Sequence, residues 1–251
     1  MRVLCTVACA ALIVTYVGRT ELRSAQTADQ TPVRPTYSVT TARNPVASAT
    51  REFKFANVAS PMKDDAAAKA IVRLVDGESD PNGAPLNALI DGFWPGEEDE
   101  PAANFFFNAG TGGGRFRLDL GSVIDVAEVR TYSWHPNTRG PQVYTLFVSD
   151  GTDPKFNSSP RNDVDPVTVG WTLVTSVDTR TSHPQGDPGG QYAASVKRSG
   201  GTLGRIRHLL FACAATEFDD SWGNTFYSEI DVIASTSPAA PAQRPRLTRR
   251  E

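Results

Sequence analysis

The chain has 251 residues, of which 39% are hydrophobic and 21% are charged, a composition typical of a folded protein. Its formal net charge of −3 argues against a broad surface for nucleic acid or anionic lipid. The length allows one large domain or two small ones, and the 20 Gly and 18 Pro residues indicate many turns.

Residues 1–25 have the features of a secretory signal peptide. A short basic start precedes an almost continuously apolar run over residues 3–18, and a polar segment with small residues follows. The apolar run is short for a membrane span, although an uncleaved N-terminal anchor is the alternative. We therefore expect a protein that is secreted, extracellular or periplasmic, with no stable membrane insertion after signal cleavage.

Cleavage after residue 25 would change the charge and the cysteine content. It removes three arginines and one glutamate, so the formal charge falls from −3 to −5. Cys5 and Cys9 leave with the signal and only Cys213 stays, which rules out an intramolecular disulfide and a cysteine metal site in the mature chain. An exported domain without disulfides needs a large core or a structural ion to remain folded.

Composition divides the rest of the chain into three parts. Residues 26–50 are rich in Thr, Pro, Ser and Ala without periodicity, and we expect a disordered linker. Residues 51–235 form the predicted domain, and residues 236–251 form a disordered basic tail. Residues 64–75 are compatible with a short helix capped by Asp64 that ends in a strand, but the sequence leaves this open because their Ala-rich and β-branched halves have opposite propensities.

Runs that alternate apolar and polar residues dominate the predicted domain. Three of them, at residues 116–120, 124–129 and 144–148, follow one another with short breaks, and period-two alternation indicates strands with one buried face. Further strands are expected at residues 53–55, 171–177, 192–196, 206–212 and 227–234. Seven or eight strands without a firm helix predict an all-β, antiparallel sandwich.

One break between strands groups residues that suit a small polar ligand. Tyr132, Trp134, His135, Asn137 and Arg139 lie within eight residues at the end of a predicted strand. An aromatic plane beside directional hydrogen-bonding groups, on a loop held by a rigid sheet, is typical of sites that bind sugars. We expect Trp134 to be exposed and to stack on a sugar ring.

Several segments, in this order, carry a resemblance to a known family. They are LIDG, GRFRLDLGSVIDVAEVRTYSWH, RGPQVYTLFVSDG, Trp171 at the start of a strand, GRIRHLLF and FYSEIDVI. The pattern resembles discoidin-type domains, the coagulation-factor type C superfamily, which includes bacterial galactose-binding-like carbohydrate-binding modules. The resemblance covers about residues 84–234 and implies an eight-stranded jelly-roll sandwich, a structural calcium ion and ligand-binding loops at one end.

The resemblance implies that Asp91 and Glu229 meet and hold the calcium ion. Carboxylates and backbone carbonyls are the oxygen ligands that this cation takes. The alternative is that Asp91 caps a turn before Gly92 and that Glu229 is a solvated strand residue. The chain departs from the family pattern at residues 97–100, an acidic insertion that either adds ligands or reshapes the site.

The resemblance also extends the ligand site. Similar modules use an aromatic residue from the loop before the last strand, and here that loop offers Trp222 and Asn224. The alternatives are that Trp134 packs against the end of the sandwich and that Arg139 is a structural arginine before Pro141.

The sequence offers no constellation for catalysis. It has no G-x-S-x-G motif, no Cys/His pair and no ligand spacing among its three histidines. We therefore expect an exported, non-enzymatic module that binds carbohydrate or a glycoconjugate on a cell surface or in a matrix. The alternative is a protein-interaction or adhesion scaffold without sugar binding. Nucleic acid is not expected as a partner.

Overall fold

The computed structural model describes residues 36–182, 186–216 and 224–236, all within one unit that spans residues 35–251. Its eight strands are β1 Tyr37–Asn44, β2 Ile71–Asp76, β3 Gly113–His135, β4 Val143–Ser149, β5 Thr172–Asp178, β6 Gly190–Arg198, β7 Gly204–Ala214 and β8 Tyr227–Ala234. Five short 3-10 helices are η1 Val46–Ser48, η2 Ala66–Lys69, η3 Leu86–Ile90, η4 Pro101–Ala103 and η5 Pro166–Val169. Every strand pairing is antiparallel, which confirms the predicted all-β fold.

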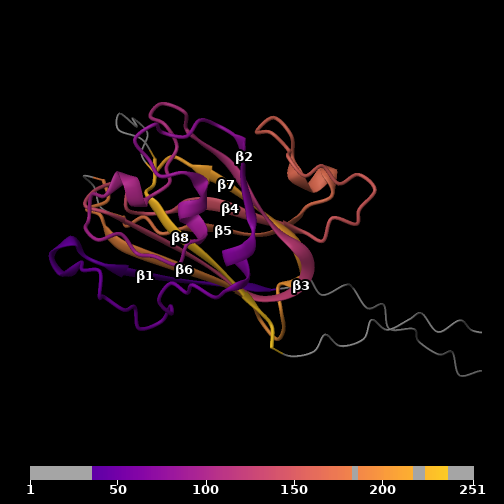
Figure 1. The fold of residues 1–251 in the computed structure, drawn as a ribbon, viewed down its shortest axis with the longest axis horizontal. Coiled ribbons are helices and arrows are strands. Elements are labelled where there is room, and N and C mark those ends of the chain that lie inside the picture. Colours follow the sequence, from indigo (N-terminus) through magenta and orange to yellow (C-terminus); the bar gives the residue numbers. More distant parts are fainter. Residues whose placement is uncertain (1–35, 183–185, 217–223, 237–251) are drawn as a thin grey trace, which may run out of the picture. The chain divides into compact units, whose positions relative to one another are not determined.

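Strand β3 belongs to both layers of the sandwich. Its first half pairs with β2 and β7, and its second half pairs with β6 and β8. The two halves are separated by a register shift between Asp119 and Ile124, where Gly121 has a φ of +78°. This left-handed conformation suits glycine, and the β3 ribbon turns back on itself there (Figure 1). The two layers are therefore β5-β4-β7-β3-β2 and β1-β6-β3-β8.

The main core lies between these two layers. Alternate residues of each strand point inward, as period-two strands require: Phe116 and Leu118 from β3, Leu146 from β4, and Ile230 and Val232 from β8 belong to one buried cluster. Two smaller clusters cover the outer faces. One is built around Tyr132 with Phe55 and Val58, and the other around Trp171 with Phe147 and Leu210.

The predicted linker contains a strand. Residues 37–44 form β1 and pair with β6 over eight successive residue pairs, so the prediction of disorder is wrong for this part of residues 26–50. β1 is an edge strand whose side chains are mostly exposed, so it shows no apolar periodicity. Residues 1–25, 26–35 and 237–251, with the predicted signal, the start of the linker and most of the tail, lie outside the described residues.

Residues 64–75 combine both of the expected conformations. A single turn, η2, is capped by Asp65, whose Oδ1 accepts a hydrogen bond from the Ala67 N–H at 2.6 Å, and β2 follows it directly. The cap is therefore Asp65 rather than Asp64. Cys213 is buried with a free thiol.

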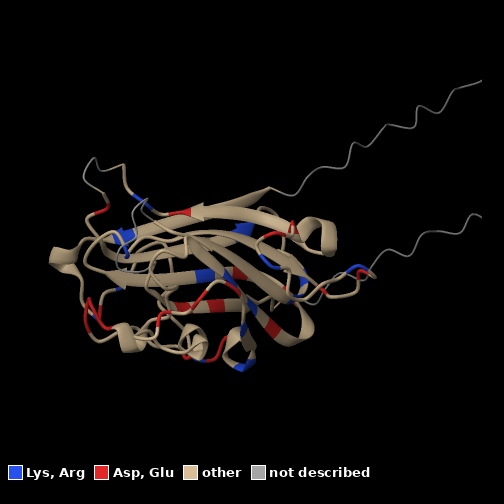
Figure 2. Cartoon of the chain, turned by 90° about the horizontal axis from the view of Figure 1, so that it is seen from above, with Lys and Arg blue, Asp and Glu red and all other residues tan. Residues whose placement is uncertain are grey.

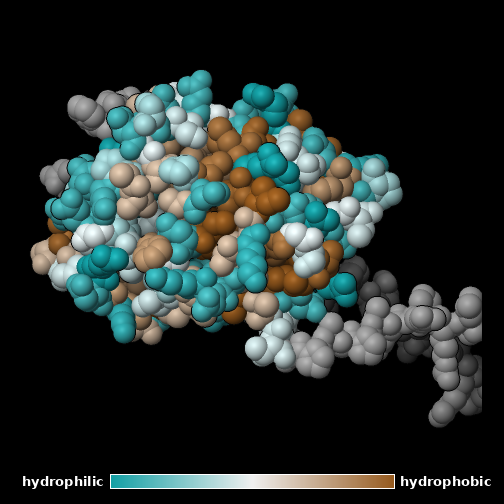
Figure 3. Space-filling model, viewed as in Figure 1, coloured by the Kyte–Doolittle hydropathy of each residue, from teal (hydrophilic) through white to brown (hydrophobic). Residues whose placement is uncertain are grey.

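The strand directions define two ends of the sandwich. We call "loop end" the end with residues 45–52, 94–104 and 136–142, and "far end" the end with the β3 bend, residues 150–171 and residues 199–203 (Figure 1, left and right). Large apolar side chains are exposed on β2, where Ile71 and Leu74 have exposed fractions of 55% and 38%. An apolar area is visible on the face where β2 runs (Figure 3). No helix in the described part of the chain is long and apolar enough to cross a membrane.

Candidate functional site

A hollow of about 500 Å³ lies at the loop end, and we call it the loop-end hollow. Two segments far apart in the sequence form its walls, residues 49–52 and residues 96–98. Trp134, the penultimate residue of strand β3, completes the lining. The volume of the hollow falls within the usual range for small-molecule sites.

Trp134 is packed rather than exposed, so the expectation of a free stacking platform is wrong. Its side chain is only 2% exposed, and its ring meets the Trp94 ring edge-to-face with centroids 6.3 Å apart. Trp94 also packs edge-to-face on Tyr132, at 5.5 Å. The contact between Trp94 and Trp134 could not be predicted from the sequence, because Trp94 lies in a loop about 40 positions earlier in the chain. Trp134 can thus present an edge to the hollow but not an open face.

His135 and Arg139 are brought together at the Phe226 ring. His135 packs edge-to-face on it with centroids 4.5 Å apart, and the Arg139 guanidinium lies 4.0 Å from its centroid. Asn224, two positions before Phe226 in the chain, donates a hydrogen bond from Nδ2 to the carbonyl oxygen of Asn108 at 3.2 Å. The structure therefore brings His135 and Arg139 together. Arg139 is half-buried and the backbone N–H of Phe226 donates to its carbonyl oxygen, in keeping with a structural role.

Asn137 and Trp222 are the other two predicted ligand residues. Asn137 is exposed, and its Oδ1 accepts a hydrogen bond from the backbone N–H of Arg139 at 3.2 Å. Trp222 lies outside the described residues.

His135 is a neutral hydrogen-bonding group at pH 7. Burial, together with the nearby positive charge of Arg139, lowers the pKa of His135 to about 4. Its Nε2 lies 3.5 Å from the Oδ1 of Asp99, in the acidic insertion. Since the ring is uncharged, this contact is polar rather than an ion pair.

Several buried polar atoms at the loop end lack a hydrogen-bond partner among the described residues. They include Nε1 of Trp94, Nε1 of Trp134, Nδ1 of His135 and Oδ1 of Asn224. Buried polar groups are nearly always hydrogen-bonded in folded proteins, and leaving one unpaired costs about 1–3 kcal/mol. Each such atom marks a place where a polar ligand or water can complete the bonding, and Nδ1 of His208, which stacks on Phe156 at the far end, is another.

The carboxylates of the loop-end hollow carry no fixed partner. Glu52, Glu97 and Glu98 are exposed, and none of their side chains makes a hydrogen bond or an ion pair with another described residue. Arg51 is the only basic residue in the lining. Acidic residues are present on loops at the left-hand end of Figure 2, the loop end. The sequence analysis identified the acidic residues 97–100. It did not identify residues 49–52, because they lie at the boundary between the expected linker and the predicted domain.

Asp91 and Glu229, the predicted calcium ligands, lie side by side. Asp91 follows η3, and its carboxyl group is within hydrogen-bonding reach of Glu229. The backbone N–H of Gly92 donates to Oε2 of Glu229 at 2.7 Å. Asp91 also caps a turn, since its Oδ1 accepts from the N–H of Phe93 at 3.0 Å. The alternative that Asp91 caps a turn is therefore correct as far as that contact goes. The alternative that Glu229 is a solvated strand residue is wrong, because Glu229 is fully buried.

The chemistry of this pair fits a hard cation. Burial, reinforced by the neighbouring Asp231 and Asp91 carboxylates, raises the pKa of Glu229 to about 9, and desolvation also raises the pKa of Asp91. Oε1 of Glu229 is buried and has no hydrogen-bond partner among the described residues. A divalent cation between the two groups would satisfy that atom and offset the charge. The described residues contain no cluster of three or more His, Cys, Asp or Glu side chains arranged for a metal, so carbonyls and water would supply the other ligands.

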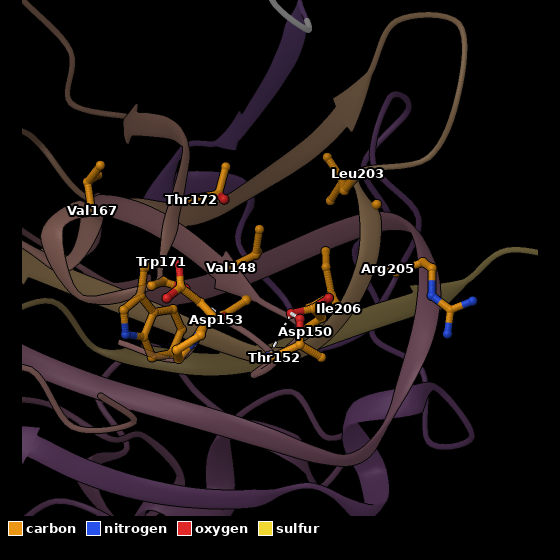
Figure 4. Close-up of a pocket in the computed structure, with 14 residues that line it drawn as sticks. Val148, Asp150, Thr152, Asp153, Val167, Trp171, Thr172, Leu203, Arg205 and Ile206 are labelled. Atoms are coloured by element: carbon orange, nitrogen blue, oxygen red, sulfur yellow. Dashed lines mark hydrogen bonds between the residues drawn. The ribbon is translucent and has the colours of Figure 1, made fainter. Parts of the chain in front are cut away.

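A second hollow, of about 630 Å³, lies at the far end, and we call it the far-end hollow (Figure 4). Several of its polar side chains make local hydrogen bonds. Asp150 Oδ1 accepts hydrogen bonds from both the N–H and the hydroxyl of Thr152, at 2.9 and 2.8 Å, and Asp153 Oδ1 accepts from the Lys155 N–H at 2.7 Å. Trp171, on one side of this hollow, donates from Nε1 to the carbonyl oxygen of Asn157 at 2.8 Å.

Solved structures with a similar fold are carbohydrate-binding and lectin domains. One is "CpGH89CBM32-6 produced by Clostridium perfringens", at 15% identity over 68% of this chain and 100% of that chain, with a TM-score of 0.35. Another is the lectin-binding domain of lectinolysin complexed with Lewis b, at 11% identity over 70% and 99%, with a TM-score of 0.39. A third, GH31 CBM32-2 bound to GalNAc, has 10% identity over 66% and 98%, with a TM-score of 0.42.

These structures belong to the group that the sequence resembles. At such identities and TM-scores the likeness concerns fold alone. No family model matches the sequence, and no curated protein matches it. The strand pairing itself defines the class of the fold, an all-β antiparallel sandwich.

Proposed function

We propose that the chain is an exported, non-catalytic binding module whose loop end recognises carbohydrate. The observation that carries the proposal is the group of unpartnered polar atoms of Trp134, His135 and Asn224 at that end. Sugar hydroxyls both donate and accept hydrogen bonds, so they complement an indole N–H, a neutral imidazole and an amide oxygen. The resemblance of the sequence to carbohydrate-binding modules supports the same reading.

Of these three residues only Trp134 lines the loop-end hollow, which is the place we propose for such a ligand. Its lining combines hydroxyl, carboxylate and guanidinium groups from Thr50, Glu52 and Arg51 with the edge of Trp134. Several directional polar groups on rigid supports are what fixes the orientation of a bound sugar. Export follows from residues 1–25, whose pattern is that of a signal peptide.

The test of carbohydrate binding is a glycan array on purified residues 26–251, followed by calorimetry on the glycans retained. Trp134→Phe keeps an aromatic ring but removes the indole N–H, and we expect it to weaken binding about fivefold, the effect of losing one hydrogen bond. Thr152→Ala at the far-end hollow is the matched control and should bind as the parent does. No retained glycan, or equal loss in the two variants, would contradict the proposal.

We also propose that Asp91 and Glu229 hold a structural calcium ion. When bound, the ion would neutralise the two carboxylates and tie η3 to β8, which carry one ligand each. A cation that binds only the folded state raises stability by mass action. Chelation should therefore lower the melting temperature, and Asp91→Asn should make melting independent of calcium. An identical melting curve with and without chelator would rule the ion out.

One observation favours a protein-interaction module as the second candidate, namely the exposed apolar residues Ile71 and Leu74 on β2. Within the described residues, β2 pairs only with β3. Binding to cells that survives enzymatic removal of surface glycans, and that is lost in Ile71→Glu but not in Trp134→Phe, would favour this candidate over sugar recognition.

A further inference from the structure

We infer that the loop end binds an extended oligosaccharide, whose sugar units occupy the loop-end hollow and a further hollow beside it, rather than a single sugar. The inference rests on the proposed function, because it names the size of the carbohydrate that the same end recognises. It combines three observations: the further hollow, the short span of chain between the two hollows, and the contacts that hold this span in place.

The further hollow, which we call the lateral hollow, has a volume of about 500 Å³. Its lining comes from the loops that follow β3, β5 and β7. The last residue of β5, Asp178, pairs with the first residue of β4, Val143, so these loops belong to the loop end. The lining side chains are four hydroxyls, two carboxylates and one guanidinium. Such groups complement sugar hydroxyls, which both donate and accept hydrogen bonds.

Only a short stretch of chain separates the two hollows. Trp134 lines the loop-end hollow and Thr138 lines the lateral hollow, and four residues of chain span at most about 14 Å. A second connection runs through the start of β6. Gln191 pairs with Trp134 and donates from Nε2 to the carbonyl oxygen of Thr50, in the wall of the loop-end hollow, at 2.7 Å. Asp187, four positions before Gln191, lines the lateral hollow. A ligand longer than one sugar ring can therefore reach from one hollow to the other.

Tight contacts hold the segments between the hollows. Gly189 has a φ of +78°, and a Cβ at this position would lie 2.2 Å from the carbonyl carbon of Pro136, so only glycine allows this approach. The buried carboxylate of Asp187 accepts hydrogen bonds from the backbone N–H of Thr181 at 2.8 Å and of Gly189 at 2.9 Å. These contacts fix the loops after β3 and β5 relative to each other, so an extended ligand would lose little affinity to the ordering of the protein.

Two hydroxyl groups of the lateral hollow are available to a ligand. Thr181 and Ser182 are exposed, and neither hydroxyl makes a hydrogen bond with another described residue. The hydroxyl of Thr216, by contrast, donates to the carbonyl oxygen of Thr138. Thr181 and Ser182 are therefore the groups through which the lateral hollow contacts a sugar unit.

The test is calorimetry of the chain with three series of β-1,4-linked sugars, built from galactose, from N-acetylglucosamine and from mannuronic acid. Each series contains the monosaccharide, the disaccharide and the tetrasaccharide. In at least one series we expect the tetrasaccharide to bind about tenfold or more tightly than the monosaccharide, because its second contact becomes intramolecular. The stoichiometry should be one tetrasaccharide per chain.

A double variant, Thr181→Ala with Ser182→Ala, separates the two hollows. It should weaken tetrasaccharide binding about tenfold or more, because each lost hydrogen bond costs about fivefold. It should leave monosaccharide affinity unchanged, because a single sugar occupies the loop-end hollow. The matched control, Thr152→Ala with Thr172→Ala, removes two hydroxyls from the far-end hollow and should change neither affinity.

Three outcomes overturn the inference and leave carbohydrate binding standing. They are a monosaccharide that binds as tightly as its tetrasaccharide, two tetrasaccharides bound per chain, and a Thr181→Ala, Ser182→Ala variant that binds the tetrasaccharide as the parent does. No binding by any member of the three series also overturns the inference, and an empty glycan array would then overturn the proposed function as well.

Discussion

The loop-end hollow and the far-end hollow contain similar residues, a tryptophan and several carboxylates, but these residues differ in their hydrogen bonding. Each has one tryptophan at its inner side, Trp134 at 2% and Trp171 at 3% exposure, and each has carboxylates in its lining. At the far end the indole N–H of Trp171 and the carboxylates of Asp150 and Asp153 all make local hydrogen bonds. At the loop end the indole N–H of Trp134 and the lining glutamates make none that the described residues supply.

Under the proposed function, this difference separates a structural hollow at the far end from a ligand site at the loop end. The volumes, about 630 and 500 Å³, would rank the far-end hollow first. Unused hydrogen-bonding capacity favours the loop-end hollow instead. Groups that already make hydrogen bonds within turns gain little free energy from a ligand, whereas an unpaired group gains a complete hydrogen bond. Free bonding capacity is therefore the better guide to function in this fold.

The largest expected effect is one that the two ends share. Trp134→Ala and Trp171→Ala each remove a large, buried ring, and each should lower the free energy of unfolding by about 3–5 kcal/mol. Chemical denaturation followed by circular dichroism measures both losses. A loss below about 1 kcal/mol for Trp134→Ala would show that its ring is exposed in solution, and the similarity of the two tryptophans would fail.

The next effect concerns buried carboxylates at the two ends. Glu229 has its pKa raised to about 9, so without cation its contribution is fully present below pH 4.5 and is lost as pH rises toward 9. At the far end Asp119 is partly buried, but its contacts with Arg207, at 2.8 Å, lower its pKa, so its contribution is lost as pH falls below about 4.

Melting in chelator between pH 5 and pH 9 tests this contrast. Glu229→Gln should raise stability at pH 8 by about 1–3 kcal/mol, because folding at that pH makes the parent take up a proton on Glu229, a cost that the neutral glutamine avoids while it keeps an acceptor for Gly92. Asp119→Asn should change nothing in that window beyond a constant offset. A Glu229→Gln variant with the same pH profile as the parent would show that Glu229 is already neutralised by another group.

A smaller effect separates the two indole N–H groups. Trp171→Phe breaks the hydrogen bond to Asn157 and should cost about 1 kcal/mol more than Trp134→Phe, which breaks none within the described chain. Thermal melts of the two variants in ligand-free buffer give the comparison. Equal losses would mean that Trp134 has a partner in solution, such as an ordered water.

The smallest expected effect is that of Asp153→Asn. Asparagine keeps an oxygen acceptor for the Lys155 N–H, and the residue is exposed, so stability should change by less than about 0.5 kcal/mol. Ligand affinity should not change. A clear loss of affinity in this variant would move the ligand to the far end.

The fold could be predicted from the sequence because strand periodicity is a local property. The runs around Phe116, Val129 and Leu146 alternate as buried strands do, and all three lie in strands of the structure. β1 was missed because an edge strand with exposed side chains has no apolar pattern. The pairing of Asp91 with Glu229 came from the resemblance rather than from spacing, since 137 positions separate Gly92 from its acceptor on Glu229.

The candidate site was predicted only in part. The proximity of His135 and Arg139 was foreseen, whereas the burial of Trp134 was the alternative rather than the expectation, because it depends on Trp94 in a distant loop. The wall formed by Arg51 and Glu52 was also missed. Such a wall forms where loops that are far apart in the sequence come into contact, and the periodicity of apolar residues gives no information about contacts between loops.

The indole N–H resonances of the tryptophans provide the most direct measurement of the central claim. In a ¹⁵N-labelled chain, assigned with Trp134→Phe and Trp171→Phe, each resonance reports the hydrogen bonding of one hollow. On titration with a bound oligosaccharide, we predict that the Trp134 indole signal shifts progressively while that of Trp171 stays in place. A shift of the Trp171 signal with Trp134 unchanged would contradict the assignment of the ligand site to the loop end.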